Sequence, residues 1–252
     1  MLSITAVEGL PEIHVGADLA ALIAQHTRAQ LTLGADAVLI VAQKIVSKAE
    51  DRLIALNAVE AGPEALRLAA EVNKDPRLVE LILGESKSII RKVPGLLIVE
   101  HRSGHILANA GIDTSNIPQD EDNPQVLLWP EDPDASARRL SQALEAHLGQ
   151  SFPVIINDSI GRPWRYGTTG HAIGCYGLAP LWNQIGHSDR FGNVLRVTEP
   201  ATADGLAAAA ALVQGEAAEG LPVVWVEGCA YQRATNVNAQ SLLRDQQRDL
   251  FR

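Results

Sequence analysis

Aromatic residues, cysteine and long apolar runs are all scarce in this sequence. Aromatic residues make up only 4% of the 252 residues, whereas hydrophobic residues make up 46%. The core must therefore be built mainly from Ala, Leu, Ile and Val, which suits helices packed on a sheet. Cys175 and Cys229 are the only cysteines, which excludes a disulfide scaffold and favours reduced cytosolic thiols.

Targeting and membrane signals are also missing. The N-terminal residues lack the basic and apolar regions of a signal peptide. The most alanine-rich run, Leu206 to Val213, is too short to cross a bilayer. The net charge of −9 argues against a general nucleic-acid binder, since phosphate backbones require a basic face. We expect a cytoplasmic protein that binds neither membrane nor nucleic acid.

Familiar catalytic signatures are absent as well. The sequence contains no G-x-x-x-x-G-K-[ST] phosphate loop, no G-x-G-x-x-G dinucleotide motif, no H-E-x-x-H zinc motif and no G-x-S-x-G elbow. A nucleotide, if bound, would be held by an uncommon fold. His101 and His105 flank a turn rather than sharing one helical face, so they do not suggest a metal pair.

Helical and strand patterns alternate without a strict βαβα rhythm, which predicts an α+β fold of mixed sheets packed with helices. Residues 1–252 read as one domain, or as two intertwined subdomains, with no linker between them. Capping residues and N1 prolines predict helices at 19–26, 63–72, 76–83, 133–148 and 202–213. Apolar runs predict strands at 3–7, 37–41, 153–156 and 222–226, and a hairpin over 96–109.

Three segments have less regular patterns. The glycine-rich stretch 166–177 is expected to be loop or the start of a helix. Residues 189–193 are expected to form a turn before an extended segment at 194–198. The polar end, 241–252, is expected to form an amphipathic helix.

The most informative stretch runs from Asn157 to Arg165. It follows the buried apolar run 153–156, so we expect a strand that delivers Asp158 and Ser159 to its exit loop. Carboxylate and hydroxyl oxygens suit a hard divalent cation, and the guanidinium groups of Arg162 and Arg165 suit phosphate or carboxylate. A plain turn with surface arginines is the alternative interpretation.

A second such segment lies at the end of the predicted hairpin. Asp113 sits there among small hydroxyl and amide residues, and it could share one or two divalent ions with Asp158. A surface turn is the competing interpretation. Lys44 and Lys48 follow a buried strand and would hold phosphates, or would simply form a solvated helix face. Gly215, after an alanine-rich helix, is expected to be a C-cap.

The ordered set of motifs resembles the coenzyme F420-0:L-glutamate ligase family. The resemblance covers about residues 7–228 and rests on the stretches 7–11, 45–50, 108–116, 132–136, 158–165 and 201–216. It implies a GTP-dependent ligase that attaches L-glutamate to the side-chain carboxylate of coenzyme F420-0 and can add further γ-linked glutamates. It also implies Mn²⁺ or Mg²⁺, as two ions, with K⁺ as a helper, and an intertwined homodimer. No fused flavin reductase-like domain is expected.

The resemblance also assigns roles to residues. Asp113 and Asp158 would bind the metal, together with Ser159, which stands where the family usually has Thr, and Glu216. Arg162 and Arg165 would join the two aspartates as catalytic residues, a role inferred from their chemistry. The nucleotide site would be lined by Leu10, Pro11, Glu12, Ile13, Gln43, Lys44, Lys48, Asn116, Gln214, Gly215 and Glu216, with the segment 214–219 closing over it.

Two other functions fit the same residues. One is a metal-dependent phosphohydrolase that uses the two aspartates with water as the acceptor. The other is a non-catalytic nucleotide-binding protein.

Overall fold

A six-stranded sheet forms the larger part of the molecule, and its strand order is β1-β10-β2-β8-β9-β11. β2 and β8 pair in parallel, whereas the other neighbours are antiparallel, so the sheet is mixed. The computed structural model describes residues 1–250. The predicted α+β fold is confirmed. The strands are β1 (Ser3–Ala6), β2 (Val38–Ala42), β8 (Val154–Arg162), β9 (Arg165–Leu178), β10 (Val223–Glu227) and β11 (Arg233–Ala234).

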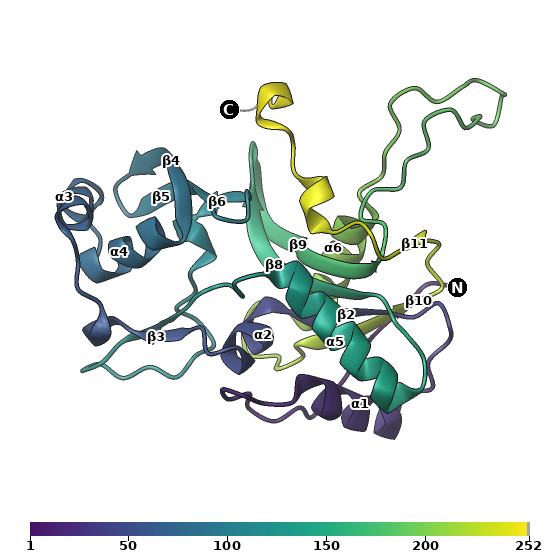
Figure 1. Ribbon diagram of the computed structural model, residues 1–252, viewed down its shortest axis with the longest axis horizontal. Coiled ribbons are helices and arrows are strands. Elements are labelled where there is room, and N and C mark those ends of the chain that lie inside the picture. The colour runs from purple at the N-terminus through teal and green to yellow at the C-terminus, as the bar shows by residue number, and fades with distance from the viewer. Residues whose placement is uncertain (251–252) are drawn as a thin grey trace.

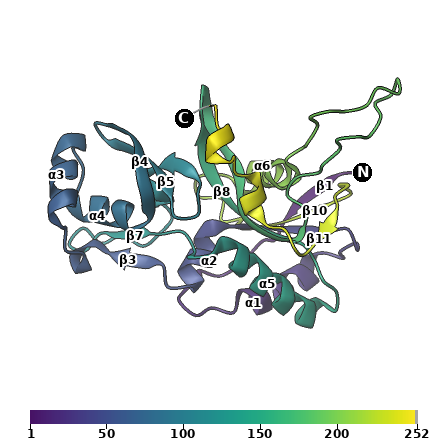
Figure 2. The same ribbon diagram turned by 45° about the horizontal axis from the view of Figure 1, so that its top comes forward.

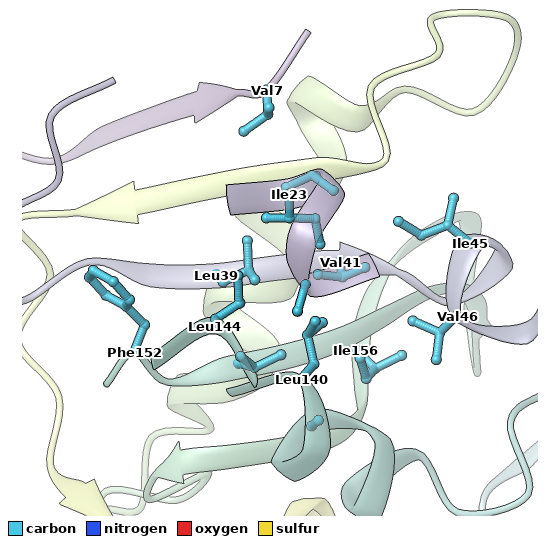
Figure 3. Close-up of a cluster of buried hydrophobic side chains, with 14 of the residues drawn as sticks. Val7, Ile23, Leu39, Val41, Ile45, Val46, Leu140, Leu144, Phe152 and Ile156 are labelled. Atoms are coloured by element: carbon cyan, nitrogen blue, oxygen red, sulfur yellow. The ribbon is translucent and has the colours of Figure 1, made fainter. Parts of the chain in front are cut away.

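Helices cover both faces of this sheet (Figure 1), and they are α1 (Leu19–Gln30), α5 (Pro133–Leu148) and α6 (Thr202–Gln214). Leu39 and Val41 of β2 pack on the side of α1 and α5, whereas Val38 and Ile40 pack on the side of α6. Figure 3 shows the first of these cores. A strand covered on both faces is apolar throughout, which is why β2 has no alternating pattern.

The segment 166–177, expected to be loop or the start of a helix, lies entirely within strand β9. Its glycines allow the two helices to approach closely. A Cβ on Gly170 would lie 2.4 Å from the carbonyl oxygen of Ala207 in α6, and one on Gly174 would lie 2.3 Å from the carbonyl carbon of Pro133 in α5. Two of the glycines that suggested a loop, Gly170 and Gly174, are therefore a packing requirement of this strand.

A smaller region lies beside the large sheet, at the left of Figure 1. A third hydrophobic core joins its helices to β5. The predicted hairpin over 96–109 is confirmed as β5 and β6. The elements of this region are α3 (Pro63–Val72), α4 (Pro76–Gly84), β4 (Ser86–Val93), β5 (Leu96–His101) and β6 (Ile106–Ala108). The short ribbon of β3 (Leu53–Ala55) and β7 (Gln125–Leu127) lies below α4 in Figure 2, and α2 (Gln43–Ala49) lies between this ribbon and the large sheet.

The predicted helix starts at 19, 63, 76, 133 and 202 are confirmed, whereas α1 ends at Gln30 and not at the predicted residue 26. The side chain of Asp18 accepts a hydrogen bond from the Ala21 amide, and that of Asp132 accepts one from Ala135, each at 2.9 Å. Prolines occupy the first position of α3, α4 and α5, where no intrahelical donor is lost. Gly149 ends α5 with φ +78°, and Gly215 ends α6 with φ +72°.

The C-terminal helix predicted at 241–252 is wrong for the described residues. The chain there forms two single 3₁₀ turns, Ala239–Leu242 and Gln246–Arg248, and residues 251–252 lie outside the description. The turn at 189–193 is present, since Asp189 accepts hydrogen bonds from the amides of Phe191 and Asn193, both at 2.8 Å. It lies in a long loop, 179–201, that projects from the body in both ribbon views (Figure 2).

Within residues 1–250, no helix combines the length and the apolar character needed to cross a membrane.

Candidate active site

One cavity of about 580 Å³ lies where the two regions of the molecule meet. Its wall combines the loop before α1, the junction of β2 and α2, the segment after β6, the middle of β8, and the loop after α6. These segments are far apart in the sequence, and the fold brings them to one place.

The structure brings most of the sequence-predicted site residues together in this cavity. Those that line it are Leu10, Pro11, Glu12, Ile13, Gln43, Lys44, Lys48, Asp113, Asn116, Asp158, Ser159, Gln214, Gly215 and Glu216. Arg162 and Arg165 are not among the lining residues. They flank the turn between β8 and β9, and Arg162 donates a hydrogen bond to the carbonyl oxygen of Tyr166 at 3.2 Å.

Asp158 lies within β8 and not in an exit loop, which corrects the sequence prediction. The strand continues to Arg162 because β9 pairs with it along its whole length, with an irregularity between Ile156 and Asn157. Both carboxylate oxygens of Asp158 accept hydrogen bonds. Oδ1 accepts from the Ser159 amide at 2.9 Å, and Oδ2 accepts from the indole N–H of Trp129 at 2.8 Å.

Asp113 reaches the same cavity from the smaller region. It follows a 3₁₀ turn at Asn109–Gly111, and its backbone exchanges two hydrogen bonds of 2.9 Å with Leu127. This pairing fixes the turn, so Asp113 is not part of a loose surface loop. Its Oδ2 lies 2.5 Å from Nζ of Lys44, which begins α2 as the second residue of that helix.

The two aspartates and Lys44 form one electrostatic group. Burial raises the pKa of Asp158, the negative charge of Asp113 raises it further, and the charge of Lys44 opposes both effects. Burial also raises the pKa of Asp113, Lys44 lowers it, and the charge of Glu216 raises it. Two carboxylates that share one ammonium group still carry excess negative charge, which a bound cation would neutralise.

This donor set fits a hard divalent cation. Asp113, Asp158 and the hydroxyl of Ser159 offer oxygen ligands only, as Mg²⁺ and Mn²⁺ prefer. Across the described part of the chain, no group of three or more His, Cys, Asp or Glu side chains could form a metal cage on its own. Mg²⁺ is commonly held by one or two carboxylates, with phosphate oxygens and water completing its shell.

Lys48 provides a second positive charge in the cavity. Its side chain is largely buried and its Nζ lies 2.5 Å from Oε1 of Glu12, which comes from the loop before α1. The alternative of a solvated helix face is therefore wrong for Lys48. The two lysines and the aspartates together make a cavity in which anionic groups and cations can be bound side by side.

The loop after α6 forms the remaining wall. Asn116 donates a hydrogen bond to the carbonyl oxygen of Ala217 at 3.0 Å, which ties this loop to the segment carrying Asp113. Asn157 donates to Oε1 of Gln214 at 2.7 Å, and Gln214 donates to the carbonyl oxygen of Pro222 at 3.2 Å. The loop is thus attached to both sides of the cavity.

Sequence reasoning missed several residues of this site. Asn157, next to Asp158, lines the cavity. Ser115, Ile117 and Pro118, around Asn116, line it as well. The only signal in the sequence for these residues was that they lie next to residues of the motifs. Trp129 gave no signal, because it lies in the apolar run 126–130 and looks like an ordinary core residue.

Comparison with known proteins identifies the family to which this chain belongs. Residues 9–228 match the F420-0:Gamma-glutamyl ligase family. The chain is 41% identical to the coenzyme F420:L-glutamate ligase of Methanothermobacter thermautotrophicus, over 100% of this chain and 99% of that protein. It is 43% identical to that of Methanopyrus kandleri, over 96% and 94% of the two chains. For Methanosarcina mazei the identity is 38%, over 98% and 94%.

By these similarities the protein is an enzyme of the ligase class. It belongs to the F420-0:Gamma-glutamyl ligase family, as its motifs suggested.

Proposed function

We propose that this enzyme attaches L-glutamate to the side-chain carboxylate of coenzyme F420-0, in a reaction that consumes GTP and requires Mn²⁺ or Mg²⁺. Family membership over nearly the whole chain supports the two organic substrates. The observation that carries the chemistry is the pairing of Asp113 and Asp158 beside Lys44 in one cavity.

The reaction needs a leaving group on the acceptor carboxylate. Transfer of the γ-phosphoryl group of GTP to a carboxylate oxygen releases GDP and gives an acyl phosphate. The amine of glutamate then attacks the carbonyl carbon, phosphate leaves, and the nitrogen loses a proton, so that one amide, one GDP and one phosphate are formed. Phosphoryl transfer of this kind depends mainly on positioning and charge neutralisation, and it requires no protein nucleophile.

The residues of the cavity would have separate roles in this reaction. Asp113, Asp158 and Ser159 would hold the divalent cations, with Glu216 approaching from the loop after α6. When bound, these ions would neutralise phosphate charge and align the reacting oxygens. Lys44 and Lys48 would bind phosphate oxygens, and Leu10 to Ile13, Gln43, Asn116 and the segment 214–219 would enclose the nucleotide.

Arg162 and Arg165 would have a different role. Because they lie at the turn of the β8–β9 hairpin, outside the cavity wall, they would bind an anionic part of the coenzyme rather than the nucleotide. Arg165 is exposed, as binding to a large substrate requires.

We also propose a homodimer, with K⁺ as an additional cation and with further γ-linked glutamates as possible products. The loop 179–201 supports the dimer. It projects from the body (Figure 2). Its side chains Phe191 and Val197 are 88% and 85% exposed. Large apolar side chains exposed on a projecting loop are typical of an interaction surface.

Mass spectrometry of the products tests the proposed function. The protein is incubated with coenzyme F420-0, L-glutamate, GTP and Mn²⁺, and omission of GTP or of the metal provides the controls. The expected result is a gain of one or more glutamyl units that depends on both. GTP hydrolysis without glutamyl transfer would favour a phosphohydrolase, and metal-dependent GTP binding without any product would favour a nucleotide-binding protein.

A further inference from the structure

Trp129 contacts Asp158, although it does not line the cavity. It follows β7 and is 1% exposed. Its indole N–H donates to Oδ2 of Asp158 at 2.8 Å. A buried indole N–H requires an acceptor, and here the acceptor is one of the two oxygens that would bind the metal.

The indole ring is held from several sides. The ring centroids of His101 and His105 lie 5.0 Å and 5.4 Å from that of Trp129, and the His105 ring meets it edge-on. On another side Gly111 leaves no room, since a Cβ there would lie 2.5 Å from Nε1 of Trp129. The indole therefore cannot turn away from Asp158 without displacing these neighbours.

A buried ionic cluster anchors the backbone of Trp129. Its carbonyl oxygen accepts a hydrogen bond from Nε of Arg52 at 2.8 Å. Arg52 pairs with Glu85 at 3.0 Å, and Glu85 also pairs with Arg102 at 2.7 Å. Glu85 lies 3.5 Å from Nε2 of His101, the residue that packs on the indole. The cluster thus fixes both the main chain and the ring of Trp129.

The carboxylate of Asp158 needs such support, because the terminal torsion of an aspartate is broad and does not set its orientation. The Ser159 amide holds Oδ1 and the Trp129 indole holds Oδ2. Carboxylates that bind metals are commonly fixed by outer hydrogen-bond donors, and loss of a donor of this kind weakens metal binding or activity.

We propose that Trp129 is a positioning residue that orients the Asp158 carboxylate for cation binding. The Arg52–Glu85–His101 cluster holds Trp129 in place, so it also determines the orientation of Asp158. The inference rests on the proposed function, because it assumes that Asp158 binds a divalent cation. Trp129 would touch neither substrate nor metal, and its effect would be exerted entirely through Asp158.

Mn²⁺ binding to the nucleotide-free protein, measured by calorimetry, tests the role. Trp129→Phe removes the N–H and retains an aromatic ring, and we expect roughly 10- to 100-fold weaker Mn²⁺ binding. Trp225→Phe is the matched control, since Trp225 is equally buried and its N–H donates to Oγ1 of Thr27 at 3.0 Å, away from the cavity. It should lower the melting temperature but leave Mn²⁺ affinity unchanged.

Asp158→Asn separates the inference from the function on which it rests. If Asp158→Asn loses Mn²⁺ while Trp129→Phe binds as tightly as Trp225→Phe, the positioning role is overturned and the metal site stands. If Asp158→Asn binds Mn²⁺ like the wild type, the metal site itself is wrong and the positioning role fails with it.

The indole N–H resonances of the wild-type protein give a second readout, which does not depend on whether Trp129→Phe folds. The chain has four tryptophans, so four indole N–H resonances can be assigned by substituting the other three. We expect the Trp129 resonance to shift when Mg²⁺ is added, and the Trp225 resonance to stay in place. A Trp129 resonance that does not respond to Mg²⁺ would overturn the proposal.

Discussion

The two regions of the molecule have differently built interiors, and each contributes one aspartate to the cavity. In the larger region the core is formed by apolar residues on both faces of a sheet, and Asp158 stands on a strand of that sheet. The smaller region combines an apolar core with a buried ionic cluster around Glu85, and the chain after its last strand carries Asp113.

This difference shows how the site depends on both interiors. Asp158 is positioned by a paired strand and by Trp129, whereas Asp113 is positioned by a turn and by Lys44. The apolar core should be sensitive to volume, and the ionic cluster should be sensitive to pH.

The largest effect is expected from removing either carboxylate. Asp113→Asn and Asp158→Asn should each lower glutamyl transfer by roughly 10³-fold or more, since neutralisation of transition-state charge by a metal accounts for several kcal/mol. Product formation is measured by mass spectrometry, and circular dichroism checks the fold. A variant that keeps more than a tenth of the wild-type rate would remove that aspartate from the site.

The next effect tests the packing of the larger region. Gly174→Ala would place a Cβ against the backbone of Pro133, so the free energy of unfolding in urea should fall by about 3 kcal/mol. Gly205→Ala is the matched control, because Gly205 lies exposed in α6 with nothing within 4 Å of its Cβ. It should gain roughly 0.5–1 kcal/mol. Equal effects of the two substitutions would contradict this account of β9.

Acid should destabilise the protein through the smaller region. Burial and, to a smaller extent, the charges of His101 and His171 lower the pKa of His105 to about 4. The unfolded chain gains this proton near pH 6.5 and the folded protein only near pH 4. The contribution of His105 to the free energy of unfolding should therefore fall by roughly 3 kcal/mol as the pH drops through this range. The raised pKa values of Asp158 and Asp113 act in the opposite direction over the same range, so the loss is measured as the difference between the wild type and His105→Asn.

A second loss should follow at lower pH. Burial acts to raise the pKa of Glu85, but hydrogen bonds from His101 and Arg102 and the charge of Arg52 outweigh it and hold the pKa at about 2. The stability that this carboxylate contributes is complete above pH 4.5 and is lost as the pH falls toward 2. Urea unfolding at a series of pH values measures both losses. His105→Asn should flatten only the upper one, and an unchanged profile would contradict the assignment.

The smallest effect is expected on the surface of the smaller region. Arg67 pairs with Glu71 one turn along α3, and both side chains are exposed. Arg67→Ala should change the free energy of unfolding by no more than about 0.5 kcal/mol. A loss above 1 kcal/mol, measured by urea unfolding, would show that exposed pairs matter as much here as the buried cluster.

Local signals in the sequence predicted much of the fold. Prolines at Pro63, Pro76 and Pro133 identified three helix starts, and the glycine-containing link at 102–104 identified the hairpin. Strand β9 was missed because its glycines are required by helices that pack on it from distant parts of the chain. The continuation of β8 past Asp158 was also missed, because it depends on pairing with β9, which was not predicted as a strand.

The site was predicted less evenly. The resemblance identified most residues of the cavity wall, because its motifs lie along segments that the fold brings together. It gave no indication that Arg162 and Arg165 lie at a hairpin turn, or that Trp129 contacts Asp158. Such contacts depend on tertiary packing between regions, which no local pattern records.

The central claim is that Asp113 and Asp158, one from each region, act as a single cation site. Mn²⁺ titration of the wild type, the two single Asn variants and the double variant tests it most directly, with bound and free ion separated by electron paramagnetic resonance. Each single substitution should remove nearly all binding, and the double variant should be no worse, because the two carboxylates act together. Losses that simply add, or a single variant that binds Mn²⁺ like the wild type, would contradict it.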